Sequence, residues 1–377
     1  MKAANGRGKV HPGDRMTSRE RLLAAYRGQA VDRLPFWAKV TNSTWRLSQP
    51  PQVRAWSDRE LLDYIGADGI FGARRFVRIE QPRTNAEEAR FDHVRTIVTH
   101  TPDGDLVERW TMDPLTESWH PTEFPVKTPE DLRRYRWLYA DQRLSVDERA
   151  LEAARQGVRA IGERGIVHQG WGTSPLMHLV EHVIGPVHTA YMLADLPREV
   201  EALMAEMHAA NLALVRQVAE RTPADAVVSV ENTSTTLISP AQFERYCYVH
   251  LCDYGRAVEA AGKMHELHMC GKLRALLARI DAIPASSIEA FTAPTLGDAR
   301  LADGRRLAPS KTLVGGTRVN TWLLPPGDIQ AYIQGELAAC PDHRRIVLTT
   351  AGVAPPACPA ETFRAVGRWL STQPVRC

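Results

Sequence analysis

Apolar residues recur at helical spacing early in the chain, directly behind residues that favour helix starts. Residues 17–20 read Thr-Ser-Arg-Glu, which is a capping box, and Leu22, Leu23 and Tyr26 follow it at helical spacing. A second capping box stands at residues 57–60, with apolar residues behind it and a glycine at the end. The pattern therefore predicts two N-terminal helices.

From about Gly165 onward, short β-prone runs alternate with longer helical runs. Strands that alternate with helices pair in parallel through crossover connections. This part supplies roughly six such units, and strand content before it completes eight, so we expect an α/β fold of the (β/α)8 TIM-barrel type. No Gly-rich phosphate loop opens a helix, which disfavours an open nucleotide-binding sheet. The predicted strands are 166–169, 225–231, 263–268, 287–291, 312–315 and 346–350.

One stretch, about residues 90–125, breaks this rhythm. Two β-prone runs, residues 94–98 and 106–110, flank Asp103-Gly104. Asp-Gly between two such runs is typical of a β-hairpin. We therefore expect an antiparallel hairpin excursion outside the barrel.

The start of the chain differs in composition from the rest. Residues 1–16 are polar and rich in Gly, Lys and Arg, without the apolar core of a secretory signal, so we expect a flexible N-terminal arm there. Residues 17–377 are expected to form a single barrel domain, since one α/β barrel can use this length.

Charge and cysteine content narrow the function classes. The chain has 47 basic and 44 acidic residues without a dense basic block, so no nucleic acid or membrane partner is expected. No apolar run approaches the roughly 18 residues that a membrane helix needs. Six cysteines in 377 residues do not make a disulfide scaffold, which favours the cytoplasm.

In a TIM barrel the reacting groups lie at the C-terminal ends of the strands. The most informative pair is His268 and Cys270, since positions two apart on a strand share a face. Imidazole nitrogen and thiolate sulfur are zinc ligands, but a catalytic zinc takes three protein ligands. The alternative is a packed, hydrogen-bonded histidine beside a cysteine, which the spacing alone favours.

Other strand ends carry further candidates, each with a structural alternative. Glu231 follows an apolar strand and could act as acid or base, or else pair with an arginine or cap a helix. Glu289 has the same two interpretations. Trp171 is expected either to form a wall of a ligand pocket or to pack in the hydrophobic core. Arg74 is expected either to bind a carboxylate group of the substrate or to lie on a solvent-exposed face. Asn232, next to Glu231, completes the substrate-binding candidates, and His265 is a second acid–base candidate.

Several segments, in this order and spacing, resemble the uroporphyrinogen decarboxylase superfamily, and within it the corrinoid-linked zinc methyltransferase branch. They span most of the chain. The decarboxylase branch fits less well, because residues 36–42 lack its Arg-rich motif. The segments that carry the resemblance are residues 19–25, 31–35, 125–132, 195–197, 238–243, 268–271, 315–316 and 359–361.

The resemblance implies a barrel with a pocket at the strand ends and a zinc ion that activates a thiol for methyl transfer from a corrinoid. His268 and Cys270 match the first two zinc ligands of that branch. Ala351 stands where the branch has its third ligand, so the third ligand is unidentified, with Glu231 or His265 as candidates.

The leading prediction is a methyltransferase or demethylase that moves a methyl group between a small methylated compound or thiol and a corrinoid. The corrinoid would be carried by a partner protein, and the resemblance suggests a homodimer. A metal-free decarboxylase or lyase acting on a small carboxylate is the first alternative, with Glu231 or His265 as proton shuttle. A ligand-binding barrel without catalysis is the second, motivated by Ala351.

Overall fold

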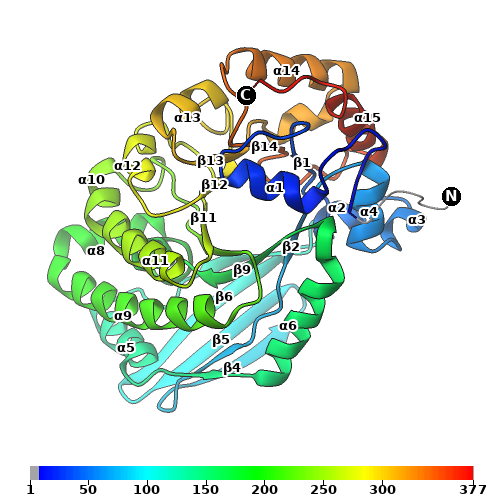
Figure 1. The fold of residues 1–377 in the computed structure, drawn as a ribbon. Coiled ribbons are helices and arrows are strands. Elements are labelled where there is room, and N and C mark those ends of the chain that lie inside the picture. The colour runs from blue at the N-terminus through cyan, green and yellow to red at the C-terminus, as the bar shows by residue number, and fades with distance from the viewer. Residues whose placement is uncertain (1–7, 377) are drawn as a thin grey trace.

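The computed structural model describes residues 8–376, and its centre is an eight-stranded parallel sheet rolled into a nearly closed barrel (Figure 1). The strands lie in the order β1-β14-β13-β12-β11-β10-β9-β2, and every neighbouring pair is parallel. The (β/α)8 prediction is confirmed. The barrel strands are β1 (Phe36–Trp37), β2 (Gly69–Gly72), β9 (Gly165–Gly172), β10 (Ala226–Val230), β11 (Met264–His268), β12 (Ser287–Phe291), β13 (Thr312–Gly315) and β14 (Ile346–Thr349).

Helices cover the outside of the barrel, as right-handed crossovers between parallel strands require. Their apolar faces and the outer faces of the strands form the main core. Before β10 the helical elements are α1 (Ser18–Tyr26), α2 (Ser43–Leu47), α3 (Pro51–Arg54), α4 (Asp58–Ile65), α5 (Pro129–Ala140), α6 (Glu148–Ile161), η1 (Gly162–Arg164), α7 (Pro175–His178), η2 (Leu179–Val183), α8 (Pro186–Asp195) and α9 (Pro197–Arg221). After it come α10 (Pro240–Gln242), η3 (Phe243–Tyr248), α11 (Val249–Ala260), α12 (Leu277–Asp281), α13 (Leu301–Leu307), η4 (Val319–Leu323), α14 (Pro326–Ala338) and α15 (Ala360–Leu370).

Helix α1 closes the end of the barrel at which the strands begin (Figure 1). Its predicted capping box is present, with Thr17 and Glu20 satisfying each other's backbone N–H groups. The Tyr26 hydroxyl donates to Glu266 inside the barrel, and the Thr312 hydroxyl donates to the carbonyl of Ala25 at 3.1 Å. The open end, which we call the mouth, is therefore where the strands finish.

Residues 8–16 are held against the barrel by a buried ion network, which differs from the flexible arm expected there. Asp14 accepts from Arg33 at 2.9 Å and lies 3.0 Å from Arg21, and both arginines also bind the fully buried Asp68. Buried charges are tolerated when they are paired in this way. The part of the predicted arm over residues 1–7 lies outside the described residues.

The predicted hairpin excursion is confirmed, and it is larger than expected. A four-stranded antiparallel sheet, which we call the canopy sheet, joins β4 (Asn85–Phe91), β5 (Val94–Thr101), β6 (Gly104–Asp113) and β7 (Ser118–Glu123). The strands β3 (Val77–Glu80) and β8 (Arg143–Val146) pair beside it. The sequence pattern missed β4 because all its residues are exposed, so no apolar alternation marks it.

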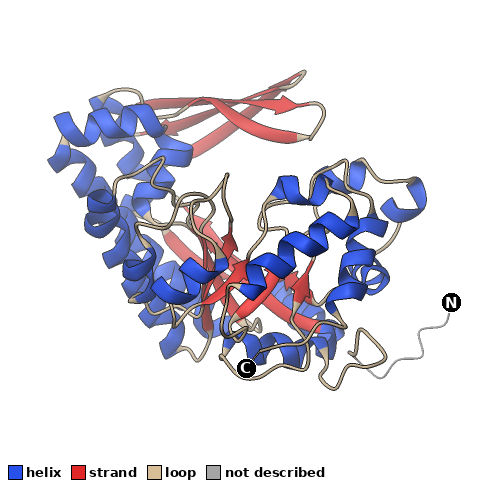
Figure 2. Ribbon diagram, turned by 90° about the horizontal axis from the view of Figure 1, so that it is seen from above, coloured by secondary structure: helices blue, strands red, loops and turns tan. Residues whose placement is uncertain are grey.

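The canopy sheet stands apart from the barrel strands, on the side of the mouth (Figure 2). Trp110 of β6 stacks on His182, which follows β9, with ring centroids 6.3 Å apart. The Thr44 hydroxyl, in the segment after β1, donates to the carbonyl of Thr116 at 3.2 Å. The sheet is thus attached to segments that follow two different barrel strands. Among the described residues, no helix has the length and apolarity to span a bilayer.

Candidate active site

Alternation along β11 sends His268 into the barrel mouth. Glu266 and His268 face inward, whereas the intervening Leu267 packs in the outer core. On the neighbouring strand β12, Glu289 lies in register with His268. Its carboxylate accepts from Nδ1 of His268 through Oε2 and from Nζ of Lys39 through Oε1, the latter at 2.7 Å. Three strands therefore contribute to one polar cluster.

Cys270 lies beside His268, as the sequence predicts. The thiol is close enough to the imidazole to help raise its pKa, and it donates to Oδ1 of Asn232 at 3.4 Å. The amide of Asn232 in turn donates to Glu181 at 2.7 Å. Asn232 has a φ of 46°, a left-handed conformation that asparagine tolerates better than most residues and that turns the chain at the end of β10.

The charged groups in this cluster stabilise one another's ionised forms. Burial alone would lower the pKa of His268, but its hydrogen bonds with Cys270 and Glu289, and the Glu289 charge, outweigh burial and raise that pKa to about 9. Burial would raise the pKa of Glu289, but Lys39 and His268 hold it well below its usual range. Burial raises the pKa of Glu181, which is bound by Asn232. The cluster therefore combines an imidazolium, a carboxylate and an ammonium group.

Lys39 is the member of this cluster that the sequence analysis did not single out. It follows β1 and shares the inward face of Trp37, with Nζ 5.4 Å from the Trp37 ring centroid. It also donates to the carbonyl of Ala351 at 3.4 Å. The signal was present, since Lys39 lies just beyond the C-terminal end of a strand, but a two-residue strand is too short to predict.

The two predicted acid–base residues are not brought to His268. His265 is three positions away on β11, so it faces outward, where it pairs with the Ser229 hydroxyl at 2.8 Å and the Pro284 carbonyl at 3.1 Å. Glu231 is fully buried and accepts from the amide and hydroxyl of Ser174 at 2.7 and 2.5 Å. Burial lowers the pKa of His265 to about 4 and raises that of Glu231 to about 7.

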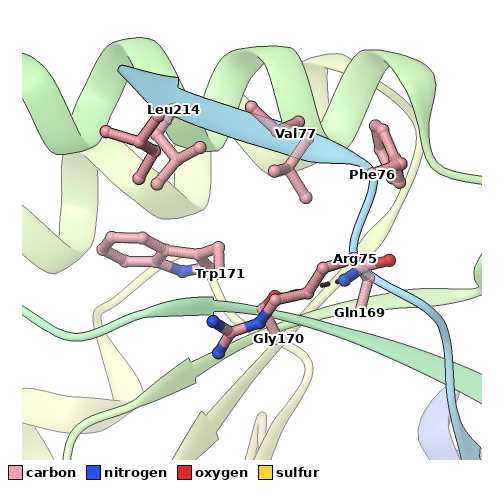
Figure 3. A pocket seen from close by; sticks show the side chains of 9 residues that line it. Arg75, Phe76, Val77, Gln169, Gly170, Trp171 and Leu214 are labelled. Atoms are coloured by element: carbon pink, nitrogen blue, oxygen red, sulfur yellow. Dashed lines mark hydrogen bonds between the residues drawn. The ribbon is translucent and has the colours of Figure 1, made fainter. Parts of the chain in front are cut away.

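Trp171 and Arg74 are also placed away from the His268 cluster. Trp171 faces outward from β9, is 7% exposed and donates to the Ser229 hydroxyl at 2.9 Å. It lines a cavity between β9, β3 and α9, with Val77 and Leu214 opposite it (Figure 3). The cavity measures about 50 Å³, which is room for only a few water molecules. Arg74 is exposed beyond the end of β2.

The donor set is incomplete for a catalytic zinc ion. His268 and Cys270 supply one nitrogen and one sulfur, and the bond from Nδ1 of His268 to Glu289 is a usual way to orient a ligating imidazole. Residues 8–376 contain no group of three His, Cys, Asp or Glu side chains that could hold a metal. Neither Glu231 nor His265 faces this point, and Ala351 has no donor side chain. The residues supply two of the three protein ligands that such a site takes.

Comparison with known proteins agrees with this architecture. The model of the uroporphyrinogen decarboxylase (URO-D) family matches residues 122–370, about two thirds of the chain. No curated protein sequence matches the chain.

Among solved structures, a methyltransferase from Methanosarcina mazei is similar with a TM-score of 0.60 at 15% identity, over 94% of this chain and 98% of that one. A protein assigned as a vitamin-B12 independent methionine synthase from Listeria monocytogenes gives a TM-score of 0.35 at 11% identity, over 59% of this chain and 68% of that one. The first likeness shows a shared fold, and the second is too low to support an argument. Through its family match, the chain belongs to the uroporphyrinogen decarboxylase family.

Proposed function

We propose that the chain is a methyl-transfer enzyme that demethylates a small compound at the barrel mouth. The observation that carries this proposal is the inward-facing pair His268 and Cys270, fixed from behind by Glu289. An imidazole that a carboxylate orients through one nitrogen can take part in proton transfer or ligand contact through the other. The shared fold with a methyltransferase is consistent with this chemistry and does not establish it.

In this mechanism, His268 acts on the group that leaves the methyl carbon. The bond between that carbon and its oxygen, nitrogen or sulfur breaks, and the electron pair stays on the heteroatom. The imidazolium of His268 donates its proton there, while Glu289 keeps the ring in place through Nδ1. The methyl carbon forms its new bond to the sulfur of an acceptor thiolate, so the proton given by His268 balances the step. A corrinoid carried by a partner would supply the nucleophile in place of the thiolate. Proton donation to a leaving group typically accelerates such steps by about 10²- to 10⁴-fold.

Because the donor set is incomplete, no step of this mechanism uses zinc. The family resemblance predicts three further features: zinc at His268 and Cys270, a partner protein that carries a corrinoid, and a homodimer. A zinc ion held there would supply a Lewis acid in place of the proton.

The test uses a panel of methyl ethers, thioethers and methylamines with reduced cobalamin or a simple thiol as acceptor. We expect turnover by the wild-type protein and a loss of about 100-fold or more in kcat/KM for His268→Ala. The exposed His188→Ala is the matched control and should keep full activity. Elemental analysis of the same preparations shows whether a metal is present and whether it depends on His268 and Cys270.

Two outcomes contradict the proposal. One is full activity in His268→Ala and Cys270→Ala, which would move the chemistry elsewhere. The other is no methyl transfer by the folded wild-type protein with any donor in the panel.

A second candidate is a metal-free decarboxylase or lyase acting on a small carboxylate, and Lys39 is the observation that favours it. Its ammonium group, 17% exposed as a side chain, stands at the mouth beside Glu289 and could hold an acid group. In this case His268 would take the proton-transfer role expected of Glu231 or His265. Release of carbon dioxide from a carboxylate panel, without methyl transfer, would support this candidate instead.

A further inference from the structure

One layer below His268, the inner wall of the barrel carries polar groups that no part of the mechanism uses. Trp37 of β1 and His168 of β9 both face inward there, with ring centroids 6.4 Å apart. Thr349 of β14 is in register with Trp37 and shares the inward face of Val347. Lys39 lies directly above, 5.4 Å from the Trp37 ring centroid.

The acceptors on this wall already have partners. Glu266 accepts from Tyr26 and from the Ser287 hydroxyl at 3.0 Å, and its other oxygen lies 3.0 Å from Nδ1 of His168. Each oxygen of Glu289 is engaged as well, one by His268 and one by Lys39. Both carboxylates are therefore occupied by donors within the barrel.

Several other polar side-chain atoms on this wall have no hydrogen-bond partner. Within residues 8–376, Nε1 of Trp37, Nε2 of His168 and Oγ1 of Thr349 are buried without a hydrogen-bond partner. Lys39 uses two of its three N–H groups on described residues, namely for Glu289 and the Ala351 carbonyl. Buried polar groups are satisfied in more than nine cases out of ten, so a cluster of unsatisfied ones on one wall needs an explanation.

The chemistry of these groups defines what would satisfy them. The Trp37 indole is only a donor, the Lys39 ammonium is only a donor, and the Thr349 hydroxyl can donate. Burial lowers the pKa of His168, but the charge and hydrogen bond of Glu266 outweigh burial and raise it, which favours an imidazolium with a second N–H. The missing partner is thus rich in acceptors, and Lys39 and His168 place two basic side chains beside it.

We propose that Trp37, Lys39, His168 and Thr349 form a binding site for the carboxylate group of the substrate. A carboxylate has two oxygens with about four acceptor positions and no donor, which matches these groups. The charge-assisted bond from Lys39 would contribute most of the affinity. The site lies on the same inner wall as His268, so a small molecule with its acid group here extends toward the reacting pair. The inference rests on the proposed function only in taking the barrel mouth as the substrate site.

The experiment follows the indole N–H signals of the nine tryptophans by NMR while benzoate is added to the full-length protein. The Trp37 signal is assigned by its absence in Trp37→Phe. We expect one indole signal, that of Trp37, to move downfield and saturate, since its N–H gains a charged acceptor. Benzamide, which has the same shape without the charge, should move it far less.

Lys39→Met provides the second measurement, with Lys127→Met as the matched control on an exposed lysine outside the barrel. We expect benzoate binding to weaken by about tenfold or more in Lys39→Met and to stay unchanged in Lys127→Met. The proposal is wrong if the Trp37 signal does not respond to benzoate, or if it responds equally to benzamide or in Lys39→Met. No methyl donor or turnover is involved, so failure of the proposed function would not affect the result.

Discussion

At the scale of single residues, the face of the strand decides what a polar side chain can do. His265 and His268 differ by three positions on β11, so one lies among helices and the other in the mouth. Burial lowers the pKa of His265 to about 4, whereas the partners of His268 raise its pKa to about 9. Two histidines on one strand therefore have opposite charge preferences.

Protonation of Glu231 should make the free energy of unfolding depend on pH. Its pKa is raised to about 7 from 4.5, mainly by burial, so the folded protein holds this proton more tightly than the unfolded chain. The stability that this proton contributes is present at low pH and is lost as pH rises from 4.5 through 7. At about 1.4 kcal/mol per pKa unit, the loss approaches about 3 kcal/mol above pH 7.

Glu231→Gln should remove this pH dependence. We expect the free energy of unfolding of wild type, relative to the variant, to fall between pH 5 and pH 8.5 in urea titrations. Glu220→Gln, at an exposed position on α9, is the control and should follow wild type at every pH. Parallel curves for wild type and Glu231→Gln would show that the carboxyl group titrates normally.

Individual residues of the site differ in how far the sequence could predict them. The spacing of His268 and Cys270 on a strand was sufficient to pair them, and Glu289 and Asn232 were found at neighbouring strand ends. Glu231 was expected to be desolvated with a raised pKa, and burial raises its pKa to about 7. The sequence could not show that it binds Ser174, because the alternation of β10 does not determine how the chain turns after Val230. Lys39 was missed because its partner Glu289 is 250 residues away in sequence, and one sequence does not reveal such a pairing.

At the scale of elements, helix α1 is the element that the sequence predicts most clearly. Its capping box was readable from four residues, and the structure shows the helix closing the floor of the barrel below Glu266. The canopy sheet is the opposite case. Its Asp103-Gly104 turn was readable, but the fully exposed β4 was not, because nothing in its composition separates it from a loop.

Thr17→Ala tests the contribution of the α1 cap. The side chain of Thr17 accepts from the backbone N–H of Glu20, and its loss should destabilise the protein by about 1 kcal/mol. Thr17→Ser keeps the hydroxyl and should retain most of that stability. Chemical denaturation of the three proteins provides the measurement, and equal midpoints would show that α1 is held by packing alone.

At the scale of the whole molecule, a buried ion network connects segments that the barrel strands do not. Asp68, directly before β2, accepts from Arg21 of α1 at 2.7 Å and from Arg33, before β1, at 2.9 Å. Arg33 also binds Asp14, near the start of the described chain, at 2.9 Å. These contacts fix the N-terminal segments around the closed end, where the sequence pattern alone suggested a loose arm.

Asp68→Asn should weaken the whole molecule, since two buried guanidinium groups would lose their shared carboxylate. We expect a loss of about 3–5 kcal/mol in the free energy of unfolding. The pair of exposed Asp58 and half-buried Arg46 at the surface is the comparison, and Asp58→Asn should cost less than about 1 kcal/mol. Similar costs for the two variants would mean that the buried network contributes no more than a surface pair.

The canopy sheet is tied to the barrel through segments that follow two different strands. Trp110 of β6 stacks on His182, and Thr44 donates to the carbonyl of Thr116. Any displacement of the sheet relative to the strand ends must therefore break at least one of these contacts, so the stacking and the hydrogen bond together limit how far the sheet can shift.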